Sequence, residues 1–541
     1  MYDLLIRQAQ IVDGIGQPSY VADIGIAGER IAWIGAADTG RAPKEGSATR
    51  RAPNGKRIID AKGLVLAPGF VDMHSHSDYT LLIDNRAESK LRQGVTTEVV
   101  GNCGYSAAPV YSPLLEERRS EYEGLYGLRL DWRTFPEYLE RVEASSPSIN
   151  AVFLVGHNTI RASAMGFGDL PPSREHMTRM ESLVDEALDC GAFGLSTGLF
   201  YAPACFARKE ELIQLAKRVS RRGGILTSHI RSEGKYLIEA LEEILAIAKG
   251  AEVPLEISHL KTFGRENWRK LDQALEMIES ARHQGLEVTF DRYPYLAAST
   301  SLQSLLPDWA QAGGPRAIVH RIMDPSTRRK LVHYLLTEYR DEDYWASIFI
   351  SLVADDAHKE WEGLNLTQLA QIQGTSSAEA ALDLLVQERT QVEIVQFAMS
   401  EENLARIIRH PLAMIGSDSS SRSADGPLRI GKPHPRAFGT FARVIREFCL
   451  DKRILSLEEG VRKMTALPCQ KLGLKDRGQI REGMIADLLL FDPESIFDQA
   501  TYQNPFQYPP GIRLVMVNGR ICIEEDSSLR PGQGKILLRG Q

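Results

Sequence analysis

Two histidines one residue apart, His74 and His76, end an apolar stretch of the chain and could do chemistry together. They lie in GFVDMHSHSD, between Asp72 and Asp78. In an extended strand, residues i and i+2 point to the same face, so the two imidazoles would lie side by side. The apolar run LVLAPGFV before them is typical of a buried parallel strand, and ligand sites in α/β folds lie at the C-terminal ends of such strands. The pair is a candidate for metal ligation; the alternative is two hydrogen-bonded histidines in a loop.

Other metal-binding residue types follow later strand-like runs at the same relative place. Cys103 follows TTEVVGN, His229 follows GILTS, His259 follows PLEIS and Asp418 follows AMIGS. Imidazole nitrogen, thiolate sulfur and carboxylate oxygen are all ligands of zinc. A single His or Cys is usually a packing or hydrogen-bonding residue. The joint pattern is far less easily explained by packing, and we interpret it as a metal site.

The middle of the chain alternates strand and helix signals in the rhythm of βα units. Amphipathic patterns such as KEELIQLAKRV separate several of the strand-like runs. An α/β fold with a (β/α)8 TIM barrel is therefore predicted, with the strand ends on one rim. An open doubly wound sheet is the alternative, but no glycine-rich phosphate loop follows the first strand. The candidate strands are LVLAPGFVDMH, TTEVVGNCG, NAVFLVGHN, AFGLSTG, GILTSHI, PLEISHL, EVTFDRY and AMIGSD.

Both ends of the chain read instead as short strands with turns. DLLIRQAQIVDG and ADIGIAGERIAWIG lie near the start, and GQIREGMIADLLLFD and IRLVMVNGRICI lie near the close. We expect one small β-sandwich domain built from residues 1–62 and 478–541, with the barrel formed by residues 63–477. The polar segment from Ala36 to Arg57, rich in Gly, Pro and Arg, is expected to be an exposed loop.

Composition limits the classes of protein that need to be considered. The chain has 541 residues, of which 43% are hydrophobic and 25% charged, and a net charge of −7. It lacks the basic bias of a nucleic-acid-binding protein, the N-terminal pattern of a signal peptide and an apolar run long enough for a membrane span. Its six cysteines are scattered without framework spacing, which indicates free thiols in a reducing cytoplasm. The sequence carries no signal for an oligomeric state.

These motifs resemble the amidohydrolase superfamily and, within it, the D-aminoacylase branch, the N-acyl-D-amino-acid deacylases. The HxH after the first strand, a His ending each of strands five and six, and an Asp ending strand eight match the superfamily. EVVGNCGYSAAP, VGHNTIR, STGLFYAPA, SHLKTFG, DRYPYLAAST and KPHPRAFGTF are similar to the branch. Many members of the superfamily carry a carboxylated lysine on strand four, but AFGLSTG has none. Cys103 matches the bridging thiolate of the branch instead, which argues against a dihydropyrimidinase or dihydroorotase.

The resemblance implies zinc-dependent hydrolysis of N-acyl-D-amino acids. It implies a tighter Zn²⁺ site formed by Cys103, His229 and His259. It also implies a second, weaker metal site formed by His74, His76, Cys103 and Asp418. Asp418 would be the general base toward water and the general acid toward the leaving amine. A protein-bound zinc lowers the pKa of water to about 7 and polarises an amide carbonyl.

Recognition of the substrate's α-carboxylate is implied for Arg436 in HPRAFG, because a planar guanidinium suits a bidentate grip. Tyr293, Lys261 and Ser299 would assist it. Tyr201 would donate to the oxyanion, or alternatively be a packing aromatic. His157 is expected to support the structure around the site and not to ligate the metal.

The stretch 299–361 is long for a barrel crossover and is expected to cover the mouth as a lid. Its first segment, SLQSLLPDWAQAGG, contains no Arg or Lys. Leu302, Leu305, Leu306 and Trp309 favour an apolar partner, or alternatively pack the lid onto the barrel. We therefore expect a preference for N-acyl derivatives of D-Leu, D-Phe or D-Met over D-Glu or D-Asp.

Two other classes of function are compatible with a metal-binding barrel. One is a different metal-dependent hydrolase, such as a dipeptidase or an acyl-sugar deacetylase, against which an arginine aimed at a carboxylate argues. The other is a catalytically silent relative that acts as a scaffold. Such proteins lose metal ligands, whereas this chain keeps all six candidates.

Overall fold

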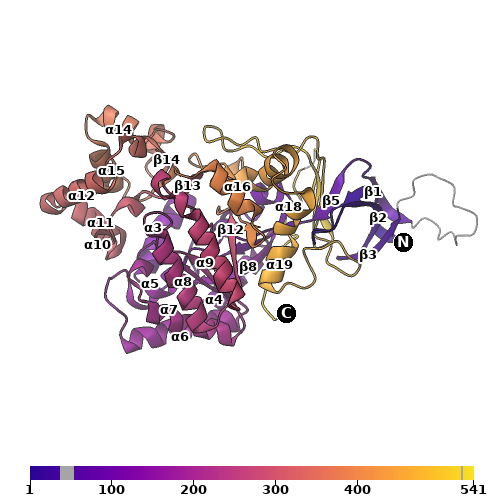
Figure 1. Cartoon of the computed structure of the whole chain (residues 1–541), viewed down its shortest axis with the longest axis horizontal. Coiled ribbons are helices and arrows are strands. Elements are labelled where there is room, and N and C mark those ends of the chain that lie inside the picture. Colours follow the sequence, from indigo (N-terminus) through magenta and orange to yellow (C-terminus); the bar gives the residue numbers. More distant parts are fainter. Residues whose placement is uncertain (37–53, 526–527, 541) are drawn as a thin grey trace, which may run out of the picture.

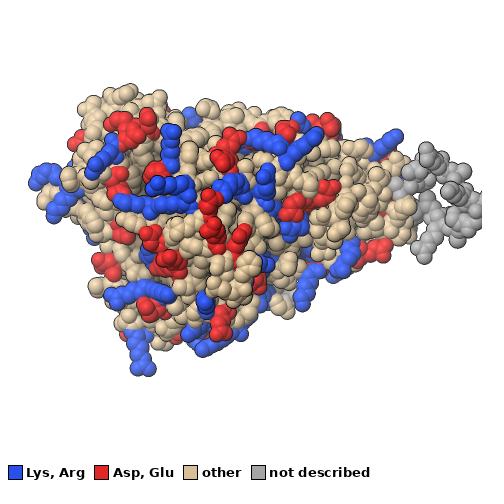
Figure 2. Space-filling model, viewed as in Figure 1, with Lys and Arg blue, Asp and Glu red and all other residues tan. Residues whose placement is uncertain are grey.

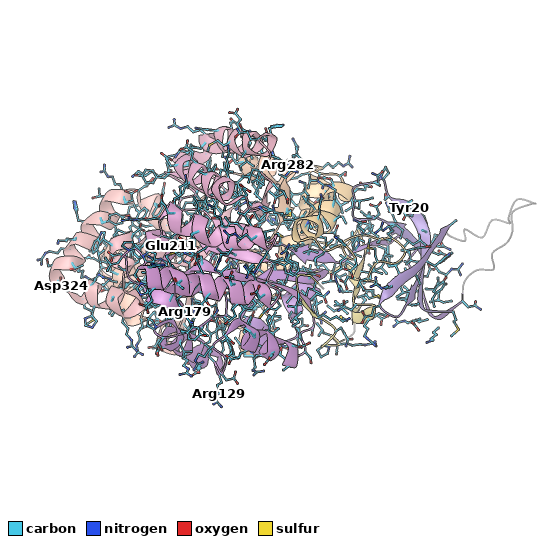
Figure 3. All side chains as sticks on the ribbon, turned by 90° about the horizontal axis from the view of Figure 1, so that it is seen from below. Tyr20, Arg129, Arg179, Glu211, Arg282 and Asp324 are labelled. Atoms are coloured by element: carbon cyan, nitrogen blue, oxygen red, sulfur yellow. The ribbon has the colours of Figure 1, made fainter. Side chains whose placement is uncertain are left out.

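The computed structural model describes residues 1–36, 54–525 and 528–540. A central barrel lies between a helical insertion at one end of the long axis and a sheet of terminal strands at the other (Figure 1). Figure 3 labels Tyr20, in the terminal sheet, and Asp324, in the helical insertion, at these opposite ends. The predicted loop from Ala36 to Arg57 lies mostly outside the described residues, and its last residues begin a strand.

The barrel is an eight-stranded parallel sheet in which each strand pairs with the next one in the order of the chain. A bridge between Ser75 and Ser419 brings the first and last strands together, so the barrel is nearly closed. The predicted (β/α)8 class is thereby confirmed. The strands are β6 (Phe70–Asp72), β7 (Val95–Val100), β8 (Asn150–Gly156), β9 (Gly194–Gly198), β10 (Ile225–His229), β11 (Leu255–Ile257), β12 (Val288–Arg292) and β16 (Ala413–Ile415).

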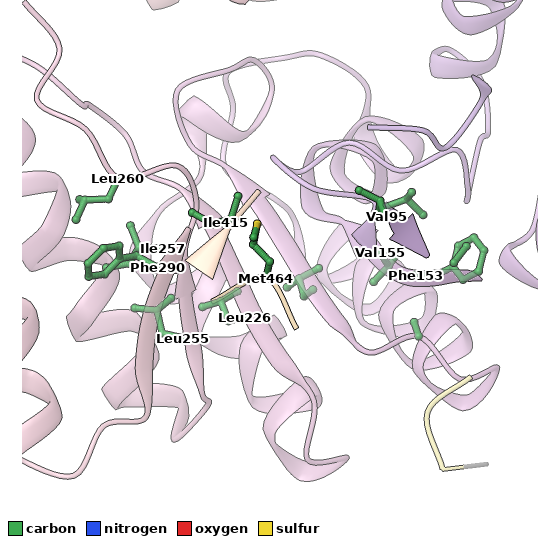
Figure 4. Packing of buried hydrophobic residues seen from close by; sticks show 14 of the residues in the cluster. Val95, Phe153, Val155, Leu226, Leu255, Ile257, Leu260, Phe290, Ile415 and Met464 are labelled. Carbon is green, nitrogen blue, oxygen red and sulfur yellow. The ribbon is translucent and has the colours of Figure 1, made fainter. Parts of the chain in front are cut away.

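Apolar side chains explain why the strands and helices close into layers. The strands are buried along their whole length, as expected for a parallel sheet covered by helices. Figure 4 shows Val95, Phe153 and Phe290 among the buried apolar residues of the strands. Helix α7 (Lys209–Arg221) buries Leu212, Leu215, Ala216 and Val219, the spacing of one helical face.

Helices follow most of the barrel strands and form its outer layer (Figure 1). Side-chain caps stabilise the N-terminal ends of several of these helices. At the start of α6 (Arg174–Asp189), for example, the side chain of Ser173 accepts the amide of His176. The helices are α3 (Leu114–Tyr126), α5 (His157–Met165), α6, α7, α8 (Leu237–Ala251), α9 (Leu271–His283), α16 (Glu401–Arg409), α17 (Arg436–Arg443), α18 (Leu457–Lys463) and α19 (Ala466–Leu472).

Strands from both ends of the chain form a separate, mainly antiparallel sheet, as predicted. Its order is β19-β18-β17-β5-β1-β2-β3, and β4 pairs with β1. The strands are β1 (Tyr2–Ile11), β2 (Tyr20–Ala27), β3 (Arg30–Ala36), β4 (Gly55–Asp60), β5 (Val65–Pro68), β17 (Leu488–Phe491), β18 (Ile512–Val517) and β19 (Arg520–Glu524).

Two short strands belong to a different sheet from the one expected for their part of the chain. The run LVLAPGFV is not one strand: β5 pairs with β1 and β17 in the terminal sheet, and β6 begins the barrel. The break falls at Gly69, where a Cβ atom would lie 2.2 Å from Cγ2 of Thr96. Near the other end, β20 (Ile536–Leu537) returns to the barrel and pairs with β8.

The helical insertion lies between β12 and β16 and contains the predicted lid. It carries a three-stranded sheet and its own apolar core, which extends from Leu302 to Ile394. The insertion is therefore longer than the predicted range 299–361, because helices and a strand beyond Trp361 complete this core. Its elements are β13 (Ala297–Ser301), α10 (Asp308–Gln311), α11 (Gly314–Met323), α12 (Pro325–Glu338), α13 (Glu342–Ala346), β14 (Ile348–Val353), α14 (Leu366–Gln373), α15 (Ser377–Gln387) and β15 (Val392–Phe397).

The surface carries both signs of charge. Figure 2 shows Lys and Arg interspersed with Asp and Glu over the visible face, without a broad region of one sign. Among the described residues, none of the helices combines the length and the apolar character that crossing a membrane requires.

Candidate metal centre and active site

The six predicted metal ligands converge at the C-terminal rim of the barrel. Donor atoms of one group lie within 4.8 Å of one another, and the same holds for a second group. The cysteine belongs to both groups, so its thiol lies between two potential metal positions. The first group is His74, His76, Cys103 and Asp418; the second is Cys103, His229 and His259.

Three of these residues have an unusual backbone conformation where their strands end. Cys103, His259 and Asp418 have φ angles of 51°, 37° and 51°. Residues other than glycine rarely adopt positive φ, and such strain is concentrated at functional sites. Hydrogen bonds hold the turns: the amide of Asp418 donates to the carbonyl of His74 at 2.8 Å. The sharp turns let the ends of separate strands present their side chains to one centre.

The donor atoms approach one another closely. Nε2 of His74 lies 3.2 Å from Sγ of Cys103, and Nε2 of His259 lies 3.4 Å from the same sulfur. Nε2 of His76 lies 3.1 Å from Oδ1 of Asp418. The nitrogens of three histidines thus surround one thiol and one carboxylate.

Two aspartates support these ligands from behind, and neither was assigned a role from the sequence. Oδ2 of Asp291 lies 3.0 Å from Nδ1 of His74, and its Oδ1 accepts the amide of His259 at 3.1 Å. Asp72 binds the ammonium of the buried Lys90 at 2.7 Å and the amide of Ser417 at 2.8 Å. A carboxylate on Nδ1 leaves Nε2 of the same histidine available to a metal.

The electrostatics of the centre fit a divalent cation. Burial alone would raise the pKa of the Cys103 thiol, but His74 and His259 lower it well below its usual range. Burial likewise opposes ionisation of Asp418, yet Arg436 and the histidines hold its pKa well below normal. Despite burial, the same two anions raise the pKa of His76 to about 9. A buried thiolate and carboxylate therefore demand positive charge between them, and this donor set is one that zinc prefers.

His229 differs from the other histidines in its electrostatics. Burial lowers the pKa of its imidazole, which favours the neutral form that ligates metals. Its ring lies against those of Phe200 and Tyr201, with centroids 5.6 and 4.8 Å away. These contacts fix the ring at the edge of the cavity.

The residues expected to bind a carboxylate lie together beside Asp418. Nη1 of Arg436 lies 2.8 Å from Oδ2 of Asp418, and its Nη2 lies 3.5 Å from the carbonyl oxygen of Ser299. The guanidinium of Arg436 lies 4.7 Å and the ammonium of Lys261 5.8 Å from the centroid of the Tyr293 ring. All four predicted residues line the same cavity.

Tyr293 adds a hydroxyl donor to this group. Burial would raise the pKa of its hydroxyl, but Lys261, Arg292 and Arg436 together lower it below the usual value. Its hydroxyl is buried without a hydrogen-bond partner among the described residues. A phenol made more acidic by three cations is a strong donor toward an anion.

Glu233 connects the metal ligands with the carboxylate-binding group and was not assigned from the sequence. Its Oε1 lies 2.5 Å from Nζ of Lys261 and 2.8 Å from Nδ1 of His259. Although burial opposes ionisation, Lys261, His229 and His259 lower the pKa of Glu233 below its usual range. Its place four residues after His229, in HIRSEG, was the signal that could have identified it.

His434, in the motif KPHPRAFGTF, positions Arg436 in a similar way. Its Nδ1 accepts the amide of Arg436 at 3.0 Å, and its Nε2 lies 3.0 Å from the carbonyl oxygen of Ala297 at the start of the insertion. Burial, reinforced by Arg436, holds the pKa of His434 well below its usual value. The neutral ring therefore joins Arg436 to the lid.

Tyr201 and His157 occupy different environments. The Tyr201 hydroxyl lies 3.1 Å from Oγ1 of Thr300, so it hydrogen-bonds to the lid at the cavity wall. Nε2 of His157 lies 2.9 Å from Oε1 of Glu211, which also accepts Nε of Arg161. Glu211, labelled in Figure 3, belongs to the helical layer. His157 thus links helices, which agrees with the structural role expected for it.

Of the four apolar residues expected to line the side-chain pocket, only Leu305 lines the cavity. Leu302 and Leu306 are buried in the core of the lid, and Trp309 is 45% exposed. The expectation that all four form the pocket together is therefore wrong for three of them: Leu302 and Leu306 pack in the insertion's own core, and Trp309 lies at the surface outside the cavity lining.

A cavity of about 2740 Å³ opens above the metal centre, between the barrel rim and the lid. It contains both the metal-binding groups and the carboxylate-binding group. Ligand pockets typically measure about 300–1,000 Å³. The cavity therefore offers far more room than the reacting groups alone would occupy.

The barrel, its two ligand groups and the adjoining cations define a metal-dependent hydrolase. The model of the amidohydrolase family matches residues 57–523. The chain belongs to this family.

Characterised relatives resemble the chain over nearly its whole length. A D-aminoacylase from Alcaligenes xylosoxydans xylosoxydans is 34% identical and is matched over 99% of this chain and 98% of its own length. The structure of an N-acyl-D-glutamate deacylase from Bordetella bronchiseptica superposes on the chain with a TM-score of 0.82 and 32% identity, covering 99% of both chains. That structure is a complex with zinc and a phosphonate mimic of the tetrahedral intermediate. A D-aminoacylase described as having a binuclear metal centre, with one-metal activation and second-metal attenuation, gives a TM-score of 0.81, 32% identity and full coverage of both chains.

Proposed function

We propose that this chain hydrolyses the amide bond of N-acyl-D-amino acids, giving a carboxylate and a free D-amino acid, with zinc as its cofactor. The observation that carries the proposal is the contact between Asp418 and Arg436, 2.8 Å apart. It joins a cluster of metal ligands to a cluster of carboxylate-binding residues. An N-acyl amino acid carries its amide and its carboxylate at a comparably short separation. The full-length similarity to D-aminoacylase and N-acyl-D-glutamate deacylase supports the same reaction.

Cys103, His229 and His259 would hold the tighter zinc ion, and His74 and His76 would complete a weaker second site with Cys103 and Asp418. A zinc ion in such a site supplies Lewis-acid chemistry and lowers the pKa of water to about 7. The structure described as activated by one metal and attenuated by the second supports this inequality of the two sites.

The protein's own residues would then move one proton and hold the substrate in place. Asp418 accepts a proton from water as the bond between the water oxygen and the acyl carbon forms. It returns that proton to the amide nitrogen as the C–N bond breaks, so atoms and charge balance. Arg436, Lys261 and Tyr293 bind the α-carboxylate, with Ser299 beside them. Tyr201 donates its hydroxyl hydrogen bond to the developing oxyanion.

Fixing two ends of the substrate also imposes the stereochemistry. With the carboxylate and the acyl carbonyl both anchored, the substituent on Cα has one direction to point, and the opposite enantiomer directs it into the wall. The lid offers Leu305, Leu352 and Phe397 to the cavity. We therefore infer D-configured substrates with a preference for apolar side chains.

Kinetics with three substrates test this function. The values of kcat/KM for N-acetyl-D-leucine, N-acetyl-L-leucine and N-acetyl-D-glutamate should fall in that order, with the zinc content of the protein measured in parallel. Equal rates for the two leucine enantiomers would contradict the stereochemical argument, and a higher rate for D-glutamate would contradict the apolar pocket. Hydrolysis of dipeptides or acyl sugars alone would favour another hydrolase, and zinc binding without hydrolysis would favour a silent relative.

The cysteines support a location in the cytoplasm. All six are free in the structure, and five of them are buried. Free thiols of this kind persist in a reducing compartment. Fractionation of the native cells tests the location, and recovery of the protein outside the cytoplasm would contradict it.

A further inference from the structure

Part of the cavity is lined mainly by aromatic residues, and of these the proposed reaction gives a role to Tyr201 alone. We name this part the aromatic chamber and define it by residues that line the cavity. They are Tyr79, Tyr105, Tyr122, Leu125, Phe200 and Tyr201. Tyr79 is 6% exposed, and the other five residues are partly exposed.

The order of the strands places Tyr105 and Tyr201 across the barrel from the strands that precede the amino-acid anchors, whereas Tyr79 follows β6, the neighbour of β16. Lys261 follows β11, and Asp418, which holds Arg436, follows β16. Four places further round the sheet lie β7, which precedes Tyr105, and β9, which precedes Tyr201. In a barrel of eight strands, four places is half the circumference. A substrate held by its carboxylate on one half therefore directs its acyl group toward the other half.

The aromatic wall runs from the metal centre outward. The ring of Tyr201 lies 4.8 Å from that of His229, and the ring of Tyr105 lies 5.8 Å from Tyr201. Helix α3 forms the far part of the wall, where Tyr122 stacks on Tyr79 with centroids 3.8 Å apart. The wall therefore reaches well beyond the length of an acetyl group, which adds one carbon to the carbonyl.

The charges around the aromatic chamber disfavour an anionic occupant. Helix α3 turns Glu116, Glu117 and Glu121 toward the cavity, together with Arg118. Arg118 is already paired, because its Nη1 lies 2.6 Å from Oε2 of Glu121. Aromatic walls of this kind gain most from planar rings and apolar chains.

We infer that the aromatic chamber receives the acyl group of the substrate and favours neutral aromatic or extended acyl groups over acetyl. This inference rests on the proposed hydrolysis of N-acyl-D-amino acids and names the class of acyl donor. Burying several additional apolar carbons is expected to raise kcat/KM by about tenfold or more.

Four derivatives of one amino acid test the inference: N-acetyl-, N-hexanoyl-, N-phenylacetyl- and N-succinyl-D-leucine. We expect the phenylacetyl and hexanoyl compounds to exceed the acetyl compound in kcat/KM by about tenfold, and the succinyl compound to be inferior to both. A binding readout accompanies the rates: phenylacetate should inhibit at a lower concentration than acetate. An acetyl compound as good as the larger neutral ones, or a succinyl compound better than they are, would overturn the inference while leaving the deacylase function intact. Absence of hydrolysis of all four by zinc-loaded protein would overturn both.

Variants on α3 locate the effect. Tyr122→Ala should lower the ratio of phenylacetyl to acetyl activity by about tenfold. Tyr126→Ala is the matched control, since Tyr126 lies one turn further along α3 and is not part of the cavity lining, and it should keep the wild-type ratio. Tyr122→Leu retains apolar volume and covers the case in which the alanine variant disturbs the stack with Tyr79. An unchanged ratio in both Tyr122 variants would contradict the assignment of this wall.

Discussion

Cys103 contributes to both groups of potential ligands, with Nε2 of His74 at 3.2 Å and Nε2 of His259 at 3.4 Å from its sulfur. Cys103→Ala should lower the zinc content and abolish hydrolysis while the fold survives, because one small side chain at a strand end is removed. Metal analysis and circular dichroism check both parts. Cys469→Ala, at a buried thiol outside the two ligand groups, is the matched control. Normal zinc and full activity in the Cys103 variant would refute the ligand assignment.

Asp418 is the residue to which proton transfer is assigned. Asp418→Asn keeps the shape of the side chain but removes its ability to accept a proton, so turnover should fall by ~100- to 10,000-fold. Zinc should remain in the site formed by Cys103, His229 and His259. Steady-state kcat and zinc content are measured together, with the exposed Asp425→Asn as a control for the substitution itself. A loss below about tenfold would mean that another group transfers the proton.

Glu233 contacts both Lys261 and His259. Glu233→Gln removes the charge that holds Lys261 and orients His259, so KM should rise and zinc affinity should fall by ~10- to 100-fold. Competition with a chelator measures the affinity, and substrate kinetics measure KM. Glu242→Gln, at an exposed position on the following helix α8, is the control. Unchanged zinc affinity with unchanged KM would show that Glu233 does not position either residue.

At the scale of elements, the positions of the site residues were largely predictable from the sequence. Apolar runs bounded by His, Cys or Asp identify strand ends, and a closed parallel barrel brings those ends to one rim. His74, Cys103 and Asp418 could therefore be grouped although they are far apart in the chain. The left-handed backbone of Cys103, His259 and Asp418 was not predictable, because it depends on contacts between strands such as the hydrogen bond from the amide of Asp418 to the carbonyl of His74.

Features that depend on packing between elements could not be read from the local sequence. The break at Gly69 arises from its close approach to Thr96 on the next strand. From the local sequence, Leu302 and Leu306 are expected to line the substrate pocket. They belong instead to a buried core whose other members lie as far along the chain as Ile394. Glu233 lies in a loop without a periodic pattern, and its role appears only when β11 places Lys261 beside it.

His157 and Glu211 link helices α5 and α7, and this link can be separated from metal binding. His157→Ala should leave zinc content unchanged but lower the melting temperature, because a buried hydrogen bond is lost and Glu211 keeps fewer partners, a cost of ~1–3 kcal/mol. The exposed His283→Ala on α9 is the control. Loss of zinc in the His157 variant would show that this histidine supports a ligand after all.

At the scale of the whole molecule, the terminal sheet and the barrel share a buried polar junction. Asp487, just before β17, accepts hydrogen bonds from Nδ2 of Asn150 at 3.1 Å and from the amide of Asn518 at 2.6 Å, and pairs with Arg477. Asn150 begins barrel strand β8, whereas Asn518 lies in the turn between β18 and β19. The C-terminal strands of the terminal sheet are therefore joined to the base of the barrel, far from the rim that carries the site.

Asp487→Ala tests whether this junction serves stability and not catalysis. Removing the carboxylate leaves the guanidinium of Arg477, which is 7% exposed, without its partner. Breaking a buried pair in this way costs about 3–5 kcal/mol. We expect a clearly lower melting temperature and faster proteolysis, while kcat/KM measured well below that temperature stays close to the wild-type value. Asp476→Ala removes a more exposed carboxylate that lies 3.8 Å from Nε of the same arginine and should change stability far less. A large fall in kcat/KM of the folded Asp487 variant would show instead that the junction transmits its effect to the rim of the barrel.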